Sequence, residues 1–226
     1  MGKLQNIQAV CFDFGNTLVY PDYQFIQKLL AEYGVHADVA KLRTLEFGAQ
    51  AAMRSPQETP RWKTYFRTWF IPTGINEENL PEIFDRLSEC FQQNRLWSCV
   101  DEDAVATLTE LKNRRYSLGV ISNSDGNLKR LMDAASLSNY FDVMVDSEKV
   151  GTRKPEPAIF NYALEKLSVQ PEEAIYVGDV YEIDILGAQR AGLNAVLFDP
   201  MNRQNHGDCL KITRLSQLLL ILNRCR

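Results

Sequence analysis

Six side chains that could take part in chemistry stand at the ends of short apolar segments or in the loops between them. Three are carboxylates, and the others are a hydroxyl, an amide and an ammonium: Asp13, Asp179, Asp184, Ser122, Asn123 and Lys154. Carboxylate oxygens suit Mg²⁺, which usually also takes oxygens of a substrate phosphate. A lysine and a hydroxyl beside such a cation would hold an anion. If the fold brings them together, these residue types predict a site for a metal ion and an anionic substrate.

Each of these side chains also has an ordinary structural explanation. An Asp at the end of a strand often only turns the chain. Asp184 could cap a helix, Ser122 could be a turn hydroxyl, and Lys154 could be a solvated charge. The order and spacing of the whole set, rather than any single residue, carry the prediction.

The segments that precede these residues predict the strands of a parallel sheet. The first, Ile7–Phe14, is short and apolar and stops at Gly15 and Asn16. After Asp103, apolar strands alternate with helices. The predicted strands cover 117–122, 141–145, 174–177 and 195–198, and the predicted helices cover 104–112, 128–135, 158–167, 184–191 and 215–222. This alternation predicts an α/β fold, a Rossmann-like doubly wound parallel sheet with helices on both faces.

This fold class would gather the candidate residues at one edge of the sheet. In open parallel sheets, ligands bind at the carboxyl ends of the strands. Asp13, Ser122 and Asp179 end or directly follow predicted strands. We therefore expect them to lie near one another, with Lys154 in a loop between them.

Residues 21–99 interrupt the alternation. Apolar side chains recur there at helical spacing, as in Phe25, Leu29 and Tyr33, and prolines and glycines divide the stretch into about four helices. We expect two domains: an α/β core made of residues 1–20 and 100–226, and a helical domain of residues 21–99 inserted after the first strand.

Composition excludes several classes of protein. The chain has 226 residues, of which 45% are hydrophobic and 24% are charged, close to the average of soluble globular proteins. A disordered, fibrous or membrane protein is therefore not expected. The net charge of −4 predicts neither a nucleic-acid partner nor binding to an anionic membrane. An anionic ligand must be bound by local chemistry, and the sequence does not indicate an oligomeric state.

Cysteine usage and the absence of a leader pattern predict a cytoplasmic protein. The five cysteines form no CxxC pair and there are only two histidines, which gives a zinc site little support. Free thiols are typical of a reducing compartment. The late apolar run Leu218–Leu222 is far shorter than the about 20 residues that a membrane span needs.

Four segments resemble the motifs of one family, the haloacid dehalogenase-like (HAD) hydrolase superfamily. They are Phe12–Leu18, Val120–Asn123, Gly151–Pro157 and Val177–Asp184, and they stand in the usual order of the family's motifs. The resemblance extends over nearly the whole chain. The helical insertion between the first two motifs looks like the C1 cap of subfamily I.

The resemblance implies a Mg²⁺-dependent phosphatase that acts on a small phosphorylated molecule. It implies that Asp13 is a nucleophile that forms an aspartyl-phosphate, and that Lys154 neutralises charge around it. Ser122 and Asn123, with Lys154, would bind the phosphate. The implied Mg²⁺ ligands are Asp13, the backbone carbonyl of Gly15, Asp179 and Asp184, the last either as a ligand or as support for one.

Gly15 departs from the family pattern. HAD phosphatases usually carry a second Asp two residues after the nucleophile, which acts as general acid and then as general base. Here that position is Gly15, and Asn16 beside it cannot act as an acid near neutral pH. Such proton transfer is typically worth roughly 10² to 10⁴ in rate. We therefore expect slow hydrolysis of ordinary alkyl phosphates and a preference for acyl or aryl phosphates.

Three alternatives stay open. A metal-independent 2-haloacid dehalogenase needs no second Asp, and Arg43 could supply a halide-binding arginine, but Asp179 stands where dehalogenases have an uncharged group. Without a metal ion, Asp13 and Asp179 would repel each other. A non-catalytic, regulatory phospho-ligand-binding protein would also explain Gly15. Phosphonatase chemistry would need a cap lysine, and the sequence does not single one out of Lys28, Lys41 and Lys63.

The substrate cannot be deduced from the sequence. Specificity would reside in the cap and in the loops that face it. The aromatic and charged candidates there are Tyr20, Tyr23, Arg43 and Trp62.

Overall fold

The computed structural model describes residues 6–52, 61–207 and 209–223. The chain divides into two compact units, Met1–Tyr20 with Cys99–Arg226 and Pro21–Ser98.

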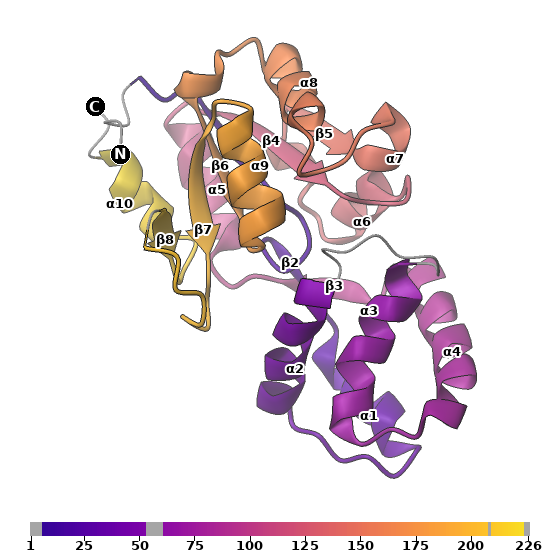
Figure 1. Ribbon diagram of the computed structural model, residues 1–226. Coiled ribbons are helices and arrows are strands. Elements are labelled where there is room, and N and C mark those ends of the chain that lie inside the picture. The colour runs from indigo at the N-terminus through magenta and orange to yellow at the C-terminus, as the bar shows by residue number, and fades with distance from the viewer. Residues whose placement is uncertain (1–5, 53–60, 208, 224–226) are drawn as a thin grey trace. The chain divides into compact units, whose positions relative to one another are not determined.

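The first unit is built on a parallel sheet, which has six strands in the described residues (Figure 1). The strand order is β5 (Val143–Asp146), β4 (Ser117–Ser122), β1 (Ala9–Phe12), β6 (Ala174–Gly178), β7 (Asn194–Phe198) and β8 (Leu210–Ile212). Every neighbouring pair is parallel. The predicted α/β class is therefore confirmed.

Helices cover both faces of this sheet. They are α5 (Ala104–Asn113), α6 (Leu128–Ala134), α7 (Ser147–Val150), α8 (Pro157–Leu167), α9 (Leu186–Arg190) and α10 (Gln217–Asn223). Helix α8 packs against β4 and β5, α9 packs against β7, and α5 contacts both β4 and α10. In Figure 1, α9 lies in front of the sheet and α5 behind it, as expected for a doubly wound fold.

Strand β1 lies at the centre of the sheet and is buried on both faces. Because side chains alternate along a strand, Ala9 and Cys11 belong to the core cluster that includes Phe160 of α8. Phe12 points to the opposite face, where its ring meets Phe141 edge-on at a centroid distance of 6.3 Å. A strand with two apolar faces can only be central, which fixes where its carboxyl end lies.

The register places the end of β1 between two other strand ends. Phe12 pairs with Val120 of β4 and with Val177 of β6. Asp13 is therefore level with the last residues of both neighbours, close to Ser122 and Asp179. The chain passes from β1 to β4 on one side and later to β6 on the other, so Asp13 stands at a topological switch point, where such folds bind ligands.

Four predicted elements start two residues later than their sequences indicate: β1, β5, α9 and α10. The strand predicted over 141–145 is β5, Val143–Asp146, because the Asp142 side chain accepts a hydrogen bond from the backbone N–H of Leu118. The helix predicted over 184–191 begins at Leu186, after a π-helical turn at Tyr181–Ile185. That turn directs the Asp184 side chain inward instead of capping a helix.

The second unit is helical. It contains α1 (Tyr23–Ala31), α2 (Val39–Ala52), α3 (Arg61–Phe70) and α4 (Leu80–Gln92), with short 3₁₀ turns at Ile71–Thr73 and Glu77–Asn79. The boundaries between the units fall in a two-stranded sheet of β2 (Val19–Pro21) and β3 (Trp97–Val100), which are too short to be predicted from periodicity.

An aromatic core and one buried carboxylate hold the helical unit together. Trp69 is fully buried and packs on Tyr23, Tyr65 and Phe66. Glu46 is also buried, and its carboxylate accepts hydrogen bonds from the hydroxyls of Tyr23 and Tyr65. A buried carboxylate is tolerated only with such donors.

Two observations bear on the predicted compartment. Cys11 and Cys90 are free thiols, and Cys225 lies outside the described residues. Among the described residues, none of the helices combines the length and the apolar character needed to cross a bilayer. The cytoplasmic location stays a prediction.

The close packing of β4 on β1 can be tested at Gly119. A Cβ atom at Gly119 would lie 2.8 Å from the Cys11 sulfur and 3.3 Å from a Leu167 methyl. We expect Gly119→Ala to lower the free energy of unfolding by about 1–3 kcal/mol, measured by urea denaturation. Gly48→Ala, where an added Cβ meets nothing within 4 Å inside α2, should instead be neutral or stabilising. Equal stability of the two variants would contradict this packing argument.

Candidate active site

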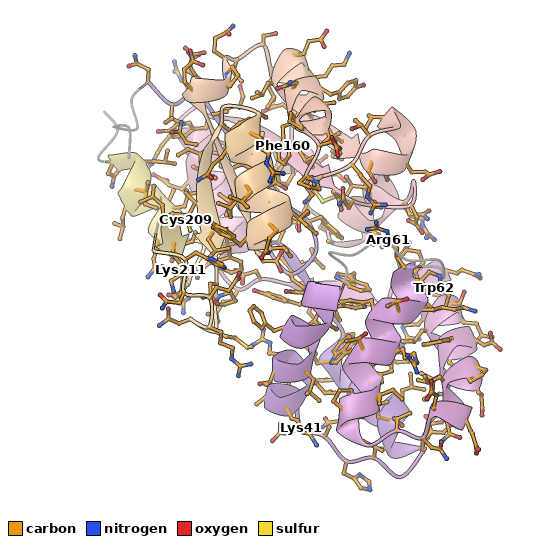
Figure 2. All side chains as sticks on the ribbon, in the orientation of Figure 1. Lys41, Arg61, Trp62, Phe160, Cys209 and Lys211 are labelled. Atoms are coloured by element: carbon orange, nitrogen blue, oxygen red, sulfur yellow. The ribbon has the colours of Figure 1, made fainter. Side chains whose placement is uncertain are left out.

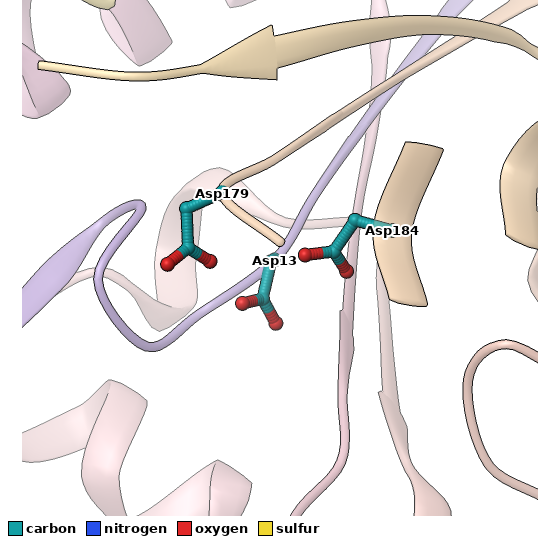
Figure 3. Close-up of side chains that lie close together, drawn as sticks. All are labelled: Asp13, Asp179 and Asp184. Atoms are coloured by element: carbon teal, nitrogen blue, oxygen red, sulfur yellow. The ribbon is translucent and has the colours of Figure 1, made fainter. Parts of the chain in front are cut away.

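Three carboxylates meet at the carboxyl edge of the sheet (Figure 3). Asp13 directly follows β1, Asp179 directly follows β6, and Asp184 lies in the π-helical turn. Each offers an oxygen atom, and these three atoms all lie within 4.8 Å of one another. The structure thus brings together the three acids that the sequence predicts.

Asp184 reaches this cluster because residue 178 is a glycine. A Cβ atom on Gly178 would lie 2.5 Å from the Asp184 Cγ, too close for any other residue type. The Asp184 carboxylate also accepts a hydrogen bond of 2.9 Å from the backbone N–H of Val180. The side chain is 1% exposed, so it is a buried acid with a fixed orientation.

Lys154 supplies a buried positive charge between the carboxylates. Its Nζ donates to Asp13 Oδ1 at 2.6 Å and to Asp184 Oδ1 at 2.7 Å. It also donates to the Tyr176 hydroxyl at 2.9 Å. The ammonium has three donors, and all three are used. With a side chain only 3% exposed, Lys154 is not a solvated surface charge.

Burial and the neighbouring charges shift the pKa values of these groups. Burial and the Asp184 charge raise the pKa of Asp13 to about 6, although Lys154 acts in the opposite direction. Burial alone would lower the pKa of Lys154, but Asp13 and Asp184 outweigh it and hold that pKa above its ordinary value. One ammonium against three carboxylates leaves excess negative charge, which a divalent cation would neutralise.

Tyr176 is part of the site, and the sequence analysis did not find it. Its hydroxyl accepts from Lys154, and it has two acceptors in reach, the Ile121 carbonyl at 3.2 Å and Asp184 Oδ1 at 3.3 Å. Burial, reinforced by the Asp184 and Asp13 charges, raises its pKa well above the ordinary value. The available signal was a phenol in the otherwise apolar strand Ala174–Gly178.

The side chain of Asn123 holds the backbone of Lys154. Its Nδ2 donates to the Lys154 carbonyl at 2.9 Å, and its Oδ1 accepts from the Lys154 N–H at 2.8 Å. Both ends of the amide are therefore used to place the lysine. Ser122 ends β4 next to it and is 8% exposed. Phosphate binding by Ser122 and Asn123 stays a prediction, which for Asn123 concerns its backbone amide.

Asp146 orders the loop that follows Ser122. Its carboxylate accepts hydrogen bonds from the backbone N–H groups of Gly126, Leu128 and Glu148 at 3.0–3.1 Å. The sequence analysis did not single it out, although an Asp at the end of an apolar strand and before a helical turn is typical of an N-cap. This carboxylate keeps the loop backbone at the sheet edge.

The turn after Asp13 contains Gly15. Gly15 forms a bridge to Val19, and Asn16 adopts a left-handed conformation with a φ of 57°. Thr17 is fully buried, and within the described part of the chain its hydroxyl has no hydrogen-bond partner. The predicted metal contact of the Gly15 carbonyl is not tested by these contacts.

The other candidates have local roles in the structure. The Tyr20 hydroxyl donates to Asp101 at 3.4 Å. Within the helical unit, the Arg43 guanidinium lies over the Tyr23 ring at 5.4 Å, and Trp62 packs edge-on against Phe84. The three lysines weighed for phosphonatase chemistry also belong to that unit, on α1, α2 and α3 (Lys41 and Trp62 are labelled in Figure 2): Lys28, Lys41 and Lys63.

Comparison with protein families gives one decisive match. The model of the haloacid dehalogenase-like hydrolases matches residues 10–198, which include every candidate of the carboxylate and lysine cluster. The chain belongs to this family.

Curated relatives of this HAD chain include proteins named as phosphatases. It is 34% identical over 137 residues to haloacid dehalogenase-like hydrolase domain-containing protein 3 of Mus musculus, which covers 60% of this chain and 54% of that protein. It is 34% identical over 140 residues to a phosphoserine phosphatase of Thermus thermophilus, covering 61% and 56%. The chain thus spans about half the length of the curated relatives it matches.

Solved structures of HAD proteins share the fold. A HAD phosphatase from Thermococcus onnurineus is 25% identical, with a TM-score of 0.66, and the match covers 97% of this chain and all of that one. A 2-haloacid dehalogenase from Pseudomonas syringae is also 25% identical, with a TM-score of 0.59 and coverage of 96% and 99%. Because these two are equally similar in sequence, the choice between phosphatase and dehalogenase must come from the site.

The role of Lys154 as the internal counter-charge of this HAD site can be tested through stability. Lys154→Met leaves Asp13 and Asp184 buried without their shared cation. We expect the free energy of unfolding in EDTA to fall by about 3–5 kcal/mol, measured by urea denaturation at pH 7.5. Lys149→Met removes an exposed lysine of α7 and should change the free energy of unfolding by less than about 0.5 kcal/mol. Similar losses in both variants would refute the counter-charge role.

Proposed function

We propose that this chain is a Mg²⁺-dependent phosphohydrolase that forms an aspartyl-phosphate on Asp13 and acts on a small phosphorylated metabolite. The observation that carries the proposal is the Asp13 carboxylate held by Lys154 beside two further acids. The Thermus thermophilus relative is named a phosphoserine phosphatase, which supports this reaction class.

The donor set fits Mg²⁺. All three acids of the cluster offer hard oxygen ligands, which this ion prefers. Lys154 balances only part of their charge, and it binds Asp13 and Asp184 through their Oδ1 atoms. Asp13, Asp179 and the Gly15 carbonyl would hold the ion, with Asp184 as a ligand or as support. When bound, Mg²⁺ would supply charge stabilisation to the phosphoryl oxygens.

The residues of the chain would divide the reaction into two displacements. An Asp13 oxygen attacks phosphorus, and the bond from phosphorus to the leaving oxygen breaks, so that this oxygen departs with the electron pair. Ser122 would hold the phosphoryl oxygens during transfer, and the Lys154 charge beside Asp13 would help to neutralise them. Water then attacks the aspartyl-phosphate at phosphorus, which releases phosphate and restores the Asp13 carboxylate.

Protonation of the leaving group would be inefficient at this site. Gly15 has no side chain that could donate a proton, and two proton donors of the cluster, Lys154 and Tyr176, already have acceptors. Lys154 directs its protons to Asp13, Asp184 and Tyr176, and the Tyr176 hydroxyl has the Ile121 carbonyl and Asp184 Oδ1 as acceptors. We infer that the enzyme favours acyl and aryl phosphates, whose leaving groups need little protonation.

The helical unit would serve as the C1 cap that selects the substrate. It is inserted into the α/β unit through β2 and β3, in the position that such caps occupy in the chain. Its aromatic and charged side chains offer contacts for a small molecule.

The dehalogenase alternative is supported by Gly15 and by the Pseudomonas syringae neighbour. It is opposed by Asp179, which is 7% exposed and lies in the carboxylate cluster. A third buried carboxylate costs free energy unless a cation balances it. The alternative of a non-catalytic, regulatory protein is supported by Gly15, which replaces the usual acid. The presence of the nucleophile Asp13 and of Lys154 opposes it.

The nucleophile provides the direct test. Wild-type protein should release phosphate from acetyl phosphate and para-nitrophenyl phosphate with Mg²⁺ and not in EDTA. Asp13→Asn should lower kcat by roughly 10³-fold or more, whereas Asp85→Asn, at an exposed site on α4, should leave it unchanged. Activity that survives in Asp13→Asn refutes the mechanism.

Two other outcomes would favour the alternatives. Chloride release from 2-chloropropionate in EDTA would favour the dehalogenase. Phosphate binding without turnover would favour the regulatory protein.

The missing acid can be restored. Gly15→Asp should raise kcat for alkyl phosphates by about 10²-fold or more, because it supplies a proton donor, and should change acetyl phosphate turnover much less. Gly48→Asp, on the exposed face of α2, is the matched control. An unchanged alkyl phosphatase rate in a folded Gly15→Asp protein would show that proton donation is not the limit.

A further inference from the structure

The peptide group between Asp179 and Val180 is held from both sides. Its carbonyl, that of Asp179, accepts a hydrogen bond of 2.8 Å from Nε2 of Gln204. Its N–H, that of Val180, donates to Asp184 Oδ2 at 2.9 Å. Because a peptide group is planar, two bonds at opposite edges fix its rotation. They thereby set the backbone angle from which the Asp179 side chain leaves the chain.

Gln204 reaches this carbonyl from a loop that the sequence analysis did not connect with the site. The loop joins β7 to β8. Gln204 is 7% exposed, and its backbone is anchored at both ends: its N–H donates to Asp199 Oδ2 at 2.8 Å, and its carbonyl accepts from Lys211 Nζ at 2.9 Å. Figure 2 labels Lys211 on β8. The amide of Gln204 is therefore presented by a fixed backbone.

Asp199 fixes the backbone of this loop through hydrogen bonds and an ion pair. The carboxylate is 2% exposed and directly follows β7. It also accepts from the Arg203 N–H at 3.1 Å and lies 3.5 Å from Lys211 Nζ. A buried carboxylate with backbone donors and a lysine is fully compensated, so the network from Lys211 to Asp179 is continuous.

We propose that Gln204 is a positioning residue for the metal ligand Asp179. The amide holds the Asp179 carbonyl on the side opposite Asp184, so the Asp179 carboxylate is already aimed before a cation binds. This inference rests on the proposed function, because it takes Asp179 as a Mg²⁺ ligand. Groups that orient metal ligands typically contribute 10–100-fold to metal affinity.

The test is Mg²⁺ titration by isothermal calorimetry with Gln204→Met, which removes the amide and keeps the length of the side chain. We expect the Kd for Mg²⁺ to rise about 10–100-fold. The kcat for acetyl phosphate at saturating Mg²⁺ should stay within about threefold of wild type, because no reacting atom is touched. Gln189→Met, at an exposed position on α9, is the matched control and should leave both quantities unchanged.

A second variant covers the case in which Gln204→Met does not fold. Gln204→Ala removes the amide without adding length or charge, so it should weaken Mg²⁺ binding in the same way. Wild-type Kd values in the folded variants would overturn the positioning role alone. If the wild-type protein itself shows no Mg²⁺ binding, the proposed function is overturned together with this inference.

Discussion

The ammonium of Lys154 is the interaction on which the site depends. It binds one carboxylate that follows β1, Asp13, and another in the turn after β6, Asp184. The backbone of Lys154 is held by the Asn123 side chain next to β4. Three separate segments are thus tied to the loop that carries this buried charge. Moving such a charge out of water costs several kcal/mol, and this cost is offset only when all partners are in place. Assembly of the sheet and assembly of the site are therefore one event.

The position of this charge follows from the sheet. Strand β1 is apolar on both faces and must be central, and parallel pairing on both sides brings three strand ends to one level. The same geometry brings carboxylates together, which is unfavourable by itself. Lys154 offsets part of the repulsion, and the remainder leaves affinity for a cation. The excess negative charge is therefore a binding property and not a defect of packing.

The sequence was sufficient to predict the parts of this arrangement that are local. Apolar strands that end in Asp or Ser predict both the α/β class and the set of acids, since strand ends are visible along the chain. The partners that orient those acids are not visible in this way. Tyr176, Gln204 and Asp199 act on residues 20 or more positions away or through backbone groups, and side-chain type alone does not reveal such bonds. The π-helical turn was missed because Asp184 at the start of a helical pattern resembles an N-cap.

The absent side chain at Gly15 then determines what such a site can discriminate. Lysine and metal stabilise phosphoryl charge regardless of the leaving group, so they do not separate one phosphate ester from another. The demand for a proton does separate them. A carboxylic acid has a pKa of about 4 and a phenol of about 10, whereas water is a far weaker acid than either and alcohols resemble water. A site that stabilises charge strongly but donates protons poorly selects its substrates by the acidity of the leaving group, before any contact from the helical unit is considered.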